Sequence, residues 1–250
     1  MRETLESIAT EAGRAILAVY DSSDFNVEMK SDDSPLTRAD LASHAVIVEA
    51  LARHFPEIPI LSEEGSLPPF SERQSWSRYF LIDPLDGTKE FIARNGEFTV
   101  NIALILDEQP ICGVVHAPAL NKTFAGIVGQ TARRSKNGAD AGRIAVRTAP
   151  ETGVIVVASR RHGDPKKIEK LLEGRRVGET RNAGSSLKFC IVAMGDADIY
   201  PRFGRTMEWD TAAGSAIIKT SHSKIYDFNL KELKYGKKDL RNSSFIVCNE

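Results

Sequence analysis

The sequence predicts an α/β protein built from two halves, an α+β half over residues 1–150 and an α/β half over residues 151–250. Two patterns predict this. The first half holds apolar runs separated by short polar turns, which is typical of an antiparallel meander; they lie at 99–106, 111–116 and 122–128. In the second half, a β-branched run at 154–158 precedes helical and strand-like segments in alternation. A chain of 250 residues with 42% hydrophobic residues can bury a sizeable core.

Helices are expected where apolar residues recur every three to four positions. Residues 5–19 follow this spacing, and a second helix is expected to begin at Thr37 and end before Pro56. Shorter helices are expected at 89–93, 186–194 and 211–219, and strands at 59–62, 79–82, 144–147 and 198–202. The polar segments 66–77 and 131–142 are expected to be loops.

Composition excludes several classes of protein. A formal net charge of -1 argues against a general nucleic-acid binder. The three cysteines, Cys112, Cys190 and Cys248, form no CxxC pair, so neither a zinc site nor a disulfide framework is indicated and a reducing cytoplasm is expected. The charged N-terminal segment is unlike a signal peptide, and no apolar run approaches the ~20 residues that span a bilayer.

The chemistry concentrates in Leu81-Ile-Asp-Pro-Leu-Asp-Gly-Thr88. An apolar strand delivers Asp83 to its end, and the turn at Pro84 brings Asp86 back beside it. Two carboxylates this close repel each other unless a cation lies between them, and such oxygen ligands suit Mg²⁺. Backbone N–H groups at the start of the helix that follows can bind a phosphate. In isolation, a turn with two solvated aspartates explains the pattern equally well.

Four further acidic residues are candidates for the same site. Each also has a structural explanation, which we favour when it is taken alone. Glu63 and Glu64 can be a solvated acidic pair, Asp210 a helix N-cap, and Asp40 the partner of Thr37 in a capping box.

Taken together, the segments 62–64, 83–88 and 208–214 resemble the inositol-monophosphatase superfamily of metal-dependent, lithium-sensitive phosphatases. The motifs Ser62-Glu-Glu64, Asp83-Pro-Leu-Asp-Gly-Thr88 and Glu208-Trp-Asp-Thr-Ala-Ala-Gly214 stand in the order of that family. The resemblance implies a layered α-β-α-β-α sandwich with the site between its halves and two or three Mg²⁺ ions.

Finer features resemble the bacterial 3′(2′),5′-bisphosphate nucleotidases of that superfamily. They are Lys30–Thr37, Lys89-Glu-Phe91, Gly184–Phe189 and Tyr200-Pro-Arg-Phe203; inositol monophosphatases usually carry Thr-Asn-Phe in place of Lys-Glu-Phe. The segment 121–142 and the short C-terminal tail depart from the family pattern.

The resemblance also implies residue roles. It assigns Glu64, Asp83 and the Leu85 carbonyl to one metal ion, and Asp83, Asp86 and Asp210 to a second. Glu64 and Thr88 would orient the attacking water, with Asp40 supporting Thr88. The substrate would contact Asp86, Gly87, Thr88, Ser185, Lys188, Arg202 and Asp210, with His162 as a weaker candidate for which an ordinary loop histidine is an equally good interpretation.

The implied activity is release of phosphate from 3′-phosphoadenosine 5′-phosphate to give AMP, and from 3′-phosphoadenylyl sulfate to give adenylyl sulfate. The nearest alternative is an inositol or sugar phosphatase of the same superfamily. A non-catalytic metal- or nucleotide-binding protein is a more distant one. The expected partner is therefore a small phosphorylated nucleotide, acted on by a cytoplasmic monomer or homodimer; the resemblance also allows peripheral association with the inner membrane.

Overall fold

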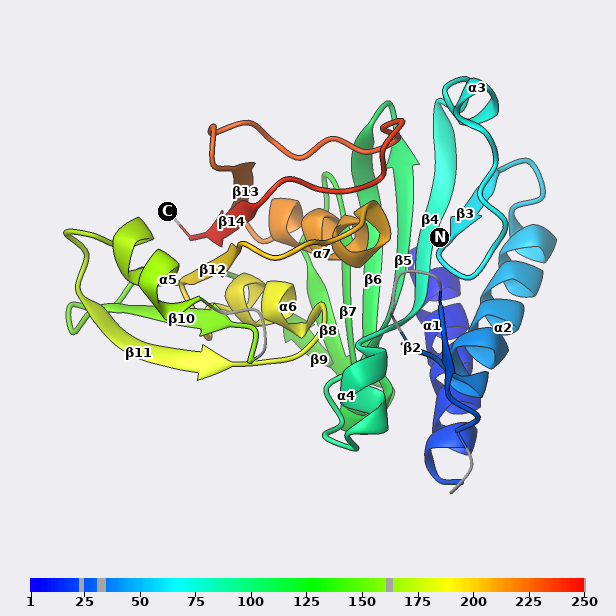
Figure 1. Ribbon diagram of the computed structural model, residues 1–250, viewed down its shortest axis with the longest axis horizontal. Helices are drawn as coiled ribbons and strands as arrows, with labels where there is room; N and C mark the ends of the chain where they lie inside the picture. Colours follow the sequence, from blue (N-terminus) through cyan, green and yellow to red (C-terminus); the bar gives the residue numbers. More distant parts are fainter. Residues whose placement is uncertain (23–24, 31–34, 161–163, 250) are drawn as a thin grey trace.

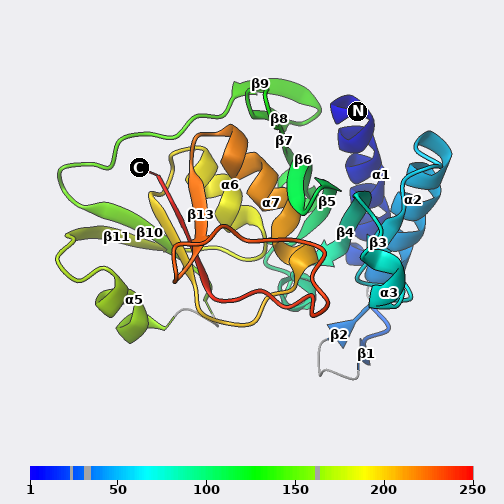
Figure 2. The ribbon, with the colours of Figure 1, turned by 90° about the horizontal axis from the view of Figure 1, so that it is seen from above.

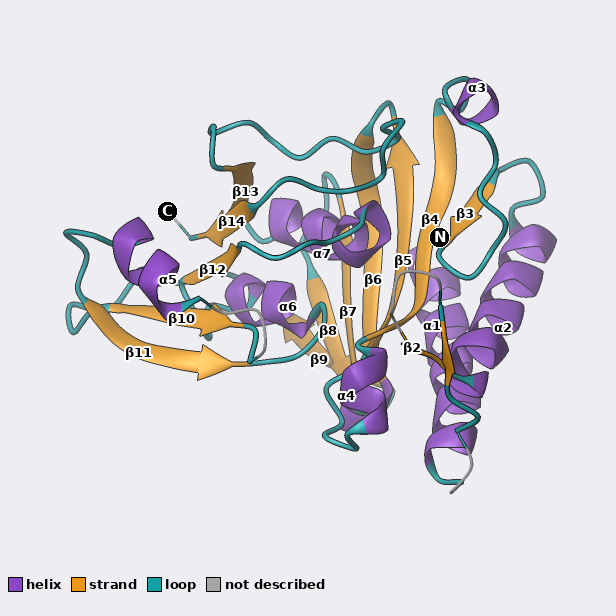
Figure 3. Cartoon of the chain, in the orientation of Figure 1, coloured by secondary structure: helices purple, strands orange, loops and turns teal. Residues whose placement is uncertain are grey.

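In the computed structural model, which describes residues 1–22, 25–30, 35–160 and 164–249, the chain forms five layers (Figures 1 and 3). Helices α1 (Arg2–Tyr20) and α2 (Arg38–His54) cover the outer face of a seven-stranded sheet. Helices α6 (Leu187–Ala193) and α7 (Glu208–Thr220) lie between this sheet and a five-stranded sheet, and α5 (Pro165–Leu171) covers the far side of the second sheet (Figure 2). The layered sandwich expected from the resemblance is confirmed.

The seven-stranded sheet follows the order β3-β4-β5-β6-β7-β8-β9. Its strands are β3 (Ile60–Ser62), β4 (Arg78–Asp86), β5 (Thr99–Leu106), β6 (Gln109–Ala117), β7 (Lys122–Ile127), β8 (Arg133–Lys136) and β9 (Ala139–Arg143). Only the β3–β4 pair among these is parallel, so the predicted meander is correct and extends by one hairpin. Short elements flank it: β1 (Glu28–Met29), β2 (Pro35–Leu36), α3 (Phe70–Arg73), α4 (Thr88–Ile92) and the 3-10 turn η1 (Pro118–Leu120).

The five-stranded sheet is mixed and follows the order β11-β10-β12-β14-β13. Its strands are β10 (Val154–Ala158), β11 (Val177–Asn182), β12 (Ile199–Arg202), β13 (Lys224–Asp227) and β14 (Phe245–Cys248). Strand β10 runs parallel to β11 and β12, whereas β14 is antiparallel to β12 and β13. Strand β14 therefore inserts between β12 and β13 in the interior of this sheet.

Helix α7 lies unusually close to the large sheet. A Cβ atom added at Gly113 would come within 2.3 Å of the Ala213 carbonyl oxygen, and one added at Gly126 within 2.3 Å of Thr220 Oγ1. Glycine is required at both positions because any side chain would push the helix away. This close contact sets the distance between α7 and the large sheet, and α7 carries Asp210 in its first turn.

Three sequence predictions on the elements are wrong. The expected loop 131–142 is the hairpin β8–β9, which turns at Asn137-Gly138 with φ angles of 52° and 74°. Its strand residues are polar because the hairpin is exposed at the sheet edge, so the apolar alternation that marks a strand is missing. The segment 144–147, expected as a strand, is irregular, and the expected loop 66–77 contains the single turn α3. The boundary near residue 150, inside the irregular segment 144–153, remains a prediction.

The C-terminal segment fastens the start of α7. The Glu208 side chain is fully buried and accepts hydrogen bonds from Gly236 N at 2.6 Å and Lys237 N at 3.0 Å. The Lys237 ammonium donates to the same carboxylate at 2.6 Å, which pairs the buried charge. The tail that departs from the family pattern thus holds the helix that presents Asp210.

Candidate active site

The end of β4 carries two aspartates, Asp83 and Asp86, on either side of a bulge. On β4, Asp83 still pairs regularly with Asn101 of β5. The register of this pairing shifts between Asp83 and Asp86, so the chain forms a bulge at Pro84 and Leu85. Leu85 N donates to Asp83 Oδ1 at 3.1 Å within the bulge. Gly87 follows with a φ of 93°, which turns the chain into α4.

Three carboxylates meet beside this bulge. Glu63, Asp83 and Asp210 each offer one oxygen atom, and these atoms lie within 4.8 Å of one another. Glu63 follows β3, whose parallel pairing with β4 brings it to the same sheet edge as Asp83. Asp210 is the third residue of α7, and its Oδ2 accepts a hydrogen bond from Met207 N at 2.9 Å. The expected N-cap position is wrong, because Met207 is the N-cap residue and Asp210 bonds its backbone N–H from the third position of the helix.

The electrostatics of this cluster fit a divalent cation. Burial, and then the neighbouring charges of Glu63 and Asp86, raise the pKa of Asp83 well above its ordinary value. Burial followed by the charge of Asp86 likewise raises the pKa of Asp210. Carboxylate oxygens at this separation match the ligand preference of Mg²⁺, and a cation would remove their mutual repulsion.

The structure brings only one of the two adjacent glutamates into the three-carboxylate cluster. Glu64 was the expected metal ligand, but the residue in the cluster is Glu63, and the Glu64 carboxylate contacts the Lys30 ammonium. Lys30 also donates to Glu63 Oε1 at 2.9 Å. Adjacent residues at a strand end point to different sides, and a Glu-Glu pair contains nothing that reveals which side faces the site.

Thr88 and Asp40 form a pair at the edge of the cluster. Asp40 is buried, and its Oδ2 accepts hydrogen bonds from Thr37 N at 2.8 Å and Thr37 Oγ1 at 2.6 Å, as the capping box predicts. Its Oδ1 accepts a bond from Thr88 Oγ1 at 3.2 Å. The two carboxylate oxygens thus serve separate purposes, one in the helix cap and one at Thr88.

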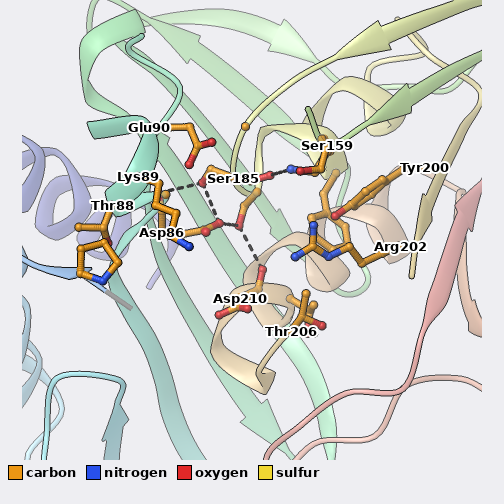
Figure 4. Close-up of a pocket in the computed structure, with 17 residues that line it drawn as sticks. Asp86, Thr88, Lys89, Glu90, Ser159, Ser185, Tyr200, Arg202, Thr206 and Asp210 are labelled. Atoms are coloured by element: carbon orange, nitrogen blue, oxygen red, sulfur yellow. Dashed lines mark hydrogen bonds between the residues drawn. The ribbon is translucent and has the colours of Figure 1, made fainter. Parts of the chain in front are cut away.

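A cavity of about 200 Å³ opens next to the carboxylates (Figure 4). The substrate-contact residues expected from the sequence line it together: Asp86, Gly87, Thr88, Ser185, Lys188, Arg202 and Asp210. His162 lies outside the described residues. The cavity is therefore bounded by α4 of the first half and by α6, β12 and the start of α7 of the second.

The wall opposite the carboxylates is cationic. Lys188 is only 3% exposed, and its Nζ donates to the Ser185 carbonyl at 2.5 Å and lies 5.3 Å from the ring centre of Tyr200. Burial lowers the pKa of Lys188 to about 8. The Nε atom of Arg202 is buried without a hydrogen-bond partner in the described structure. Lys188 is thus not the solvated surface charge that was the structural alternative, and both cations can bind an anion.

Three residues lie at the site although the sequence alone suggested no role for them. Lys30 contacts both glutamates, and Ser186 and Asn101 surround Asp86. Lys30 and Ser186 stood within motifs that carry the family resemblance. Asn101 interrupts an otherwise apolar strand, and a buried amide in such a strand was the one signal that could have found it.

Comparison with known proteins shows the family of this chain. The chain matches the inositol monophosphatase family over residues 1–250 and belongs to this family of phosphatases, whose members depend on a metal ion. The chain is 47% identical over 242 residues to the 3′(2′),5′-bisphosphate nucleotidase CysQ of Salmonella typhimurium, an alignment that covers 96% of this chain and 95% of the relative.

Solved structures agree as well. The crystal structure of CysQ from Bacteroides thetaiotaomicron superposes with a TM-score of 0.85 at 38% identity, covering 98% of this chain and 95% of the other. The inositol monophosphatase of Thermotoga maritima superposes with a TM-score of 0.82 at 26% identity, covering 99% and 91%. Among the described residues, the helices are too short or too polar to cross a membrane.

We predict that Asp83→Asn stabilises the metal-free protein while it abolishes activity. Because the raised pKa of Asp83 means that the folded state holds this proton more tightly than the unfolded chain does, the ionised carboxylate lowers stability at neutral pH. Thermal unfolding in a chelator at pH 7.5 should show a melting temperature higher by at least about 2 °C. The difference should vanish near pH 4, where Asp83 is protonated in the wild type.

The exposed Asp196→Asn is the matched control and should change neither quantity. Added Mg²⁺ should stabilise the wild type and leave Asp83→Asn almost unaffected. A variant that melts lower than the wild type in chelator, or that keeps normal turnover, would contradict the role of Asp83.

Proposed function

We propose that this phosphatase hydrolyses the 3′-phosphate of 3′-phosphoadenosine 5′-phosphate to give AMP and phosphate, and that it accepts 3′-phosphoadenylyl sulfate in the same way. The observation that carries the proposal is the pairing of a carboxylate cluster with the cationic wall formed by Lys188 and Arg202. A substrate with a single phosphate would need only the carboxylate cluster and not the cationic wall. The names of the CysQ relatives, which span nearly the whole chain, support the same substrate.

The metal ligands that we propose are the carboxylates of Glu63, Asp83, Asp86 and Asp210 and the carbonyl of Leu85. They would hold two or three Mg²⁺ ions, with Glu63 in the place first given to Glu64. Bound Mg²⁺ supplies charge neutralisation at the phosphate and lowers the pKa of water. The fit rests on the proximity of the carboxylates and on the repulsion among them.

Thr88 and Asp40 are proposed to orient the water. The Thr88 hydroxyl donates a hydrogen bond to Asp40 Oδ1, so its lone pairs are free to accept a hydrogen bond from water in the cavity. Asp40 is anchored by Thr37 and stays aligned with Thr88. Direct attack by water suits this arrangement, because the described lining of the cavity contains no cysteine or histidine to act as a nucleophile.

The second phosphate is proposed to bind Lys188 and Arg202. The buried ammonium and the free Nε of Arg202 are donors that lack a carboxylate partner at hydrogen-bonding distance among the described residues. Charge-assisted bonds to a phosphate would satisfy both. His162 remains a proposed additional contact.

The alternative within the family is an inositol phosphatase. The likeness to the Thermotoga maritima enzyme and the small volume of the cavity favour this second candidate. It leaves Lys188 and Arg202 without a function, because inositol 1-phosphate carries a single phosphate. A non-catalytic role is disfavoured because the proposed catalytic groups are all present. A cytoplasmic monomer or homodimer remains a prediction.

We expect Thr88→Ala to lower kcat far more than it raises KM. The hydroxyl contacts the water and contributes mainly in the transition state, and the loss of such an interaction reduces kcat. Steady-state kinetics at saturating Mg²⁺ measure the effect, and Thr88→Ser, which keeps the hydroxyl, should restore most of the activity. An increase confined to KM would place Thr88 in substrate binding instead.

Replacing Lys188 or Arg202 by Ala should reduce kcat/KM for the bisphosphate about ten- to a hundredfold, since a charge-assisted hydrogen bond contributes roughly 1.5–3 kcal/mol. Hydrolysis of inositol 1-phosphate should hardly change. The exposed Lys170→Ala, on α5, is the control for loss of one positive charge. Equal losses on both substrates would remove the structural basis of the nucleotidase assignment while leaving a phosphatase.

The pH dependence should also separate the two substrates. Lys188 has a pKa of about 8 in the free protein, so it is charged below this pH and loses its charge above it. Because kcat/KM reports the free enzyme, its value for the bisphosphate should fall between pH 8 and 9 relative to that for inositol 1-phosphate. Lys188→Arg keeps the charge and should abolish this relative decline; parallel profiles in the wild type would argue against the contact.

A further inference from the structure

Asp86 is held by a ring of hydrogen bonds that involves only one of its carboxylate oxygens. Ser185 Oγ and Ser186 Oγ each lie 2.7 Å from Asp86 Oδ2. Asn101 Nδ2 lies 2.7 Å from Ser186 Oγ but 3.5 Å from Asp86 Oδ2, so its short bond is the one to the serine. The Thr99 hydroxyl contacts both Asn101 Oδ1 and Ser185 Oγ. The ring therefore runs from Asp86 through both serines to Asn101 and Thr99 of β5.

The Ser186 hydroxyl takes part in this ring and does not cap its own helix. It is the N-cap residue of α6, a position where a serine hydroxyl ordinarily accepts a bond from the backbone of its own helix. No such bond forms here. Instead the hydroxyl lies 2.7 Å from Asp86 Oδ2 and 3.1 Å from the carbonyl oxygen of Asp210, so it lies between two of the proposed metal ligands.

Asn101 determines the direction of the Ser186 hydroxyl. A serine hydroxyl has one proton, and a bond accepted from Asn101 Nδ2 directs that proton toward Asp86 or the Asp210 carbonyl. Asn101 is 1% exposed and lies between the apolar Val100 and Ile102 on β5. A buried amide costs free energy unless it is hydrogen-bonded, and an apolar residue would suit an interior strand of the sheet better.

We propose that Asn101 is a positioning residue of the metal centre, which acts through Ser186 to hold Asp86 Oδ2 and leaves Oδ1 for the divalent cation. The inference rests on the metal site of the proposed function. The proposal explains why Asn101 and Ser186 are polar, which neither the capping of α6 nor the packing of β5 explains. Partners that orient ligands in this way typically change metal affinity ten- to a hundredfold when they are removed.

The test is Mg²⁺ binding without substrate, measured by isothermal titration calorimetry on the full chain. Asn101→Val and Ser186→Ala should each weaken binding about ten- to a hundredfold, whereas Ser186→Thr, which keeps the hydroxyl, should bind nearly as the wild type does. Because Asn101 acts through Ser186, the double variant should bind no more weakly than the worse single variant.

Thr123→Val is the matched control. Thr123 is also buried in the large sheet, but its hydroxyl bonds His116 at 2.9 Å, away from the carboxylates. It should lower thermal stability without changing Mg²⁺ affinity. If Asn101→Val does not fold, Asn101→Ser replaces it, because the shorter side chain cannot reach Ser186 and should weaken binding to the same extent.

The outcomes separate this inference from the function on which it rests. If the wild type binds no Mg²⁺, the proposed function fails. If the wild type binds Mg²⁺ and the Asn101 variants bind it equally well, only the role of Asn101 is overturned. Additive losses in the double variant would overturn the action through Ser186.

Discussion

The carboxylates at the end of β4 repel one another, and the surrounding structure holds them together against that repulsion. Asp83 is fixed by the strand and its bulge, Glu63 by the parallel neighbour β3, and Asp210 by the first turn of α7. Each position is secured by backbone pairing or helix capping, so none of the three can move away. The negatively charged carboxylates are therefore held by rigid elements, and such preorganised ligands favour tight binding of a cation.

The frame depends on contacts between the two halves of the chain. Gly113 and Gly126 let α7 approach the large sheet, and Glu208 ties the start of that helix to the C-terminal segment. On the other side of the cavity, Glu97 accepts a bond from Gly184 N at 2.7 Å and pairs with Arg160. These contacts hold the carboxylates and the cationic wall on opposite sides of the cavity.

Lys30 and Lys188 have different surroundings at the site. Lys30 pairs with Glu63 and Glu64, while Lys188 is kept apart, with a backbone carbonyl and the Tyr200 ring as its partners. Ser185 and Ser186 both hydrogen-bond Asp86 Oδ2, so serines and not a lysine hold this carboxylate oxygen.

Local pattern was enough to determine much of this protein. Apolar runs predicted the meander because the residues that each strand buries are visible in its own sequence. The Asp83–Thr88 motif indicated the position of the candidate site because its residues are adjacent in the chain. The polar hairpin β8–β9 escaped because an exposed edge strand needs no apolar face.

Other features were decided only by tertiary structure. The choice of Glu63 over Glu64 depends on how β3 pairs with β4, and the buried state of Lys188 depends on the packing of α6 against β12. The task of Asn101 depends on Ser186, 85 residues further along the chain. Sequence pattern records which residues can form a site, whereas the direction of each side chain follows from pairings between distant segments.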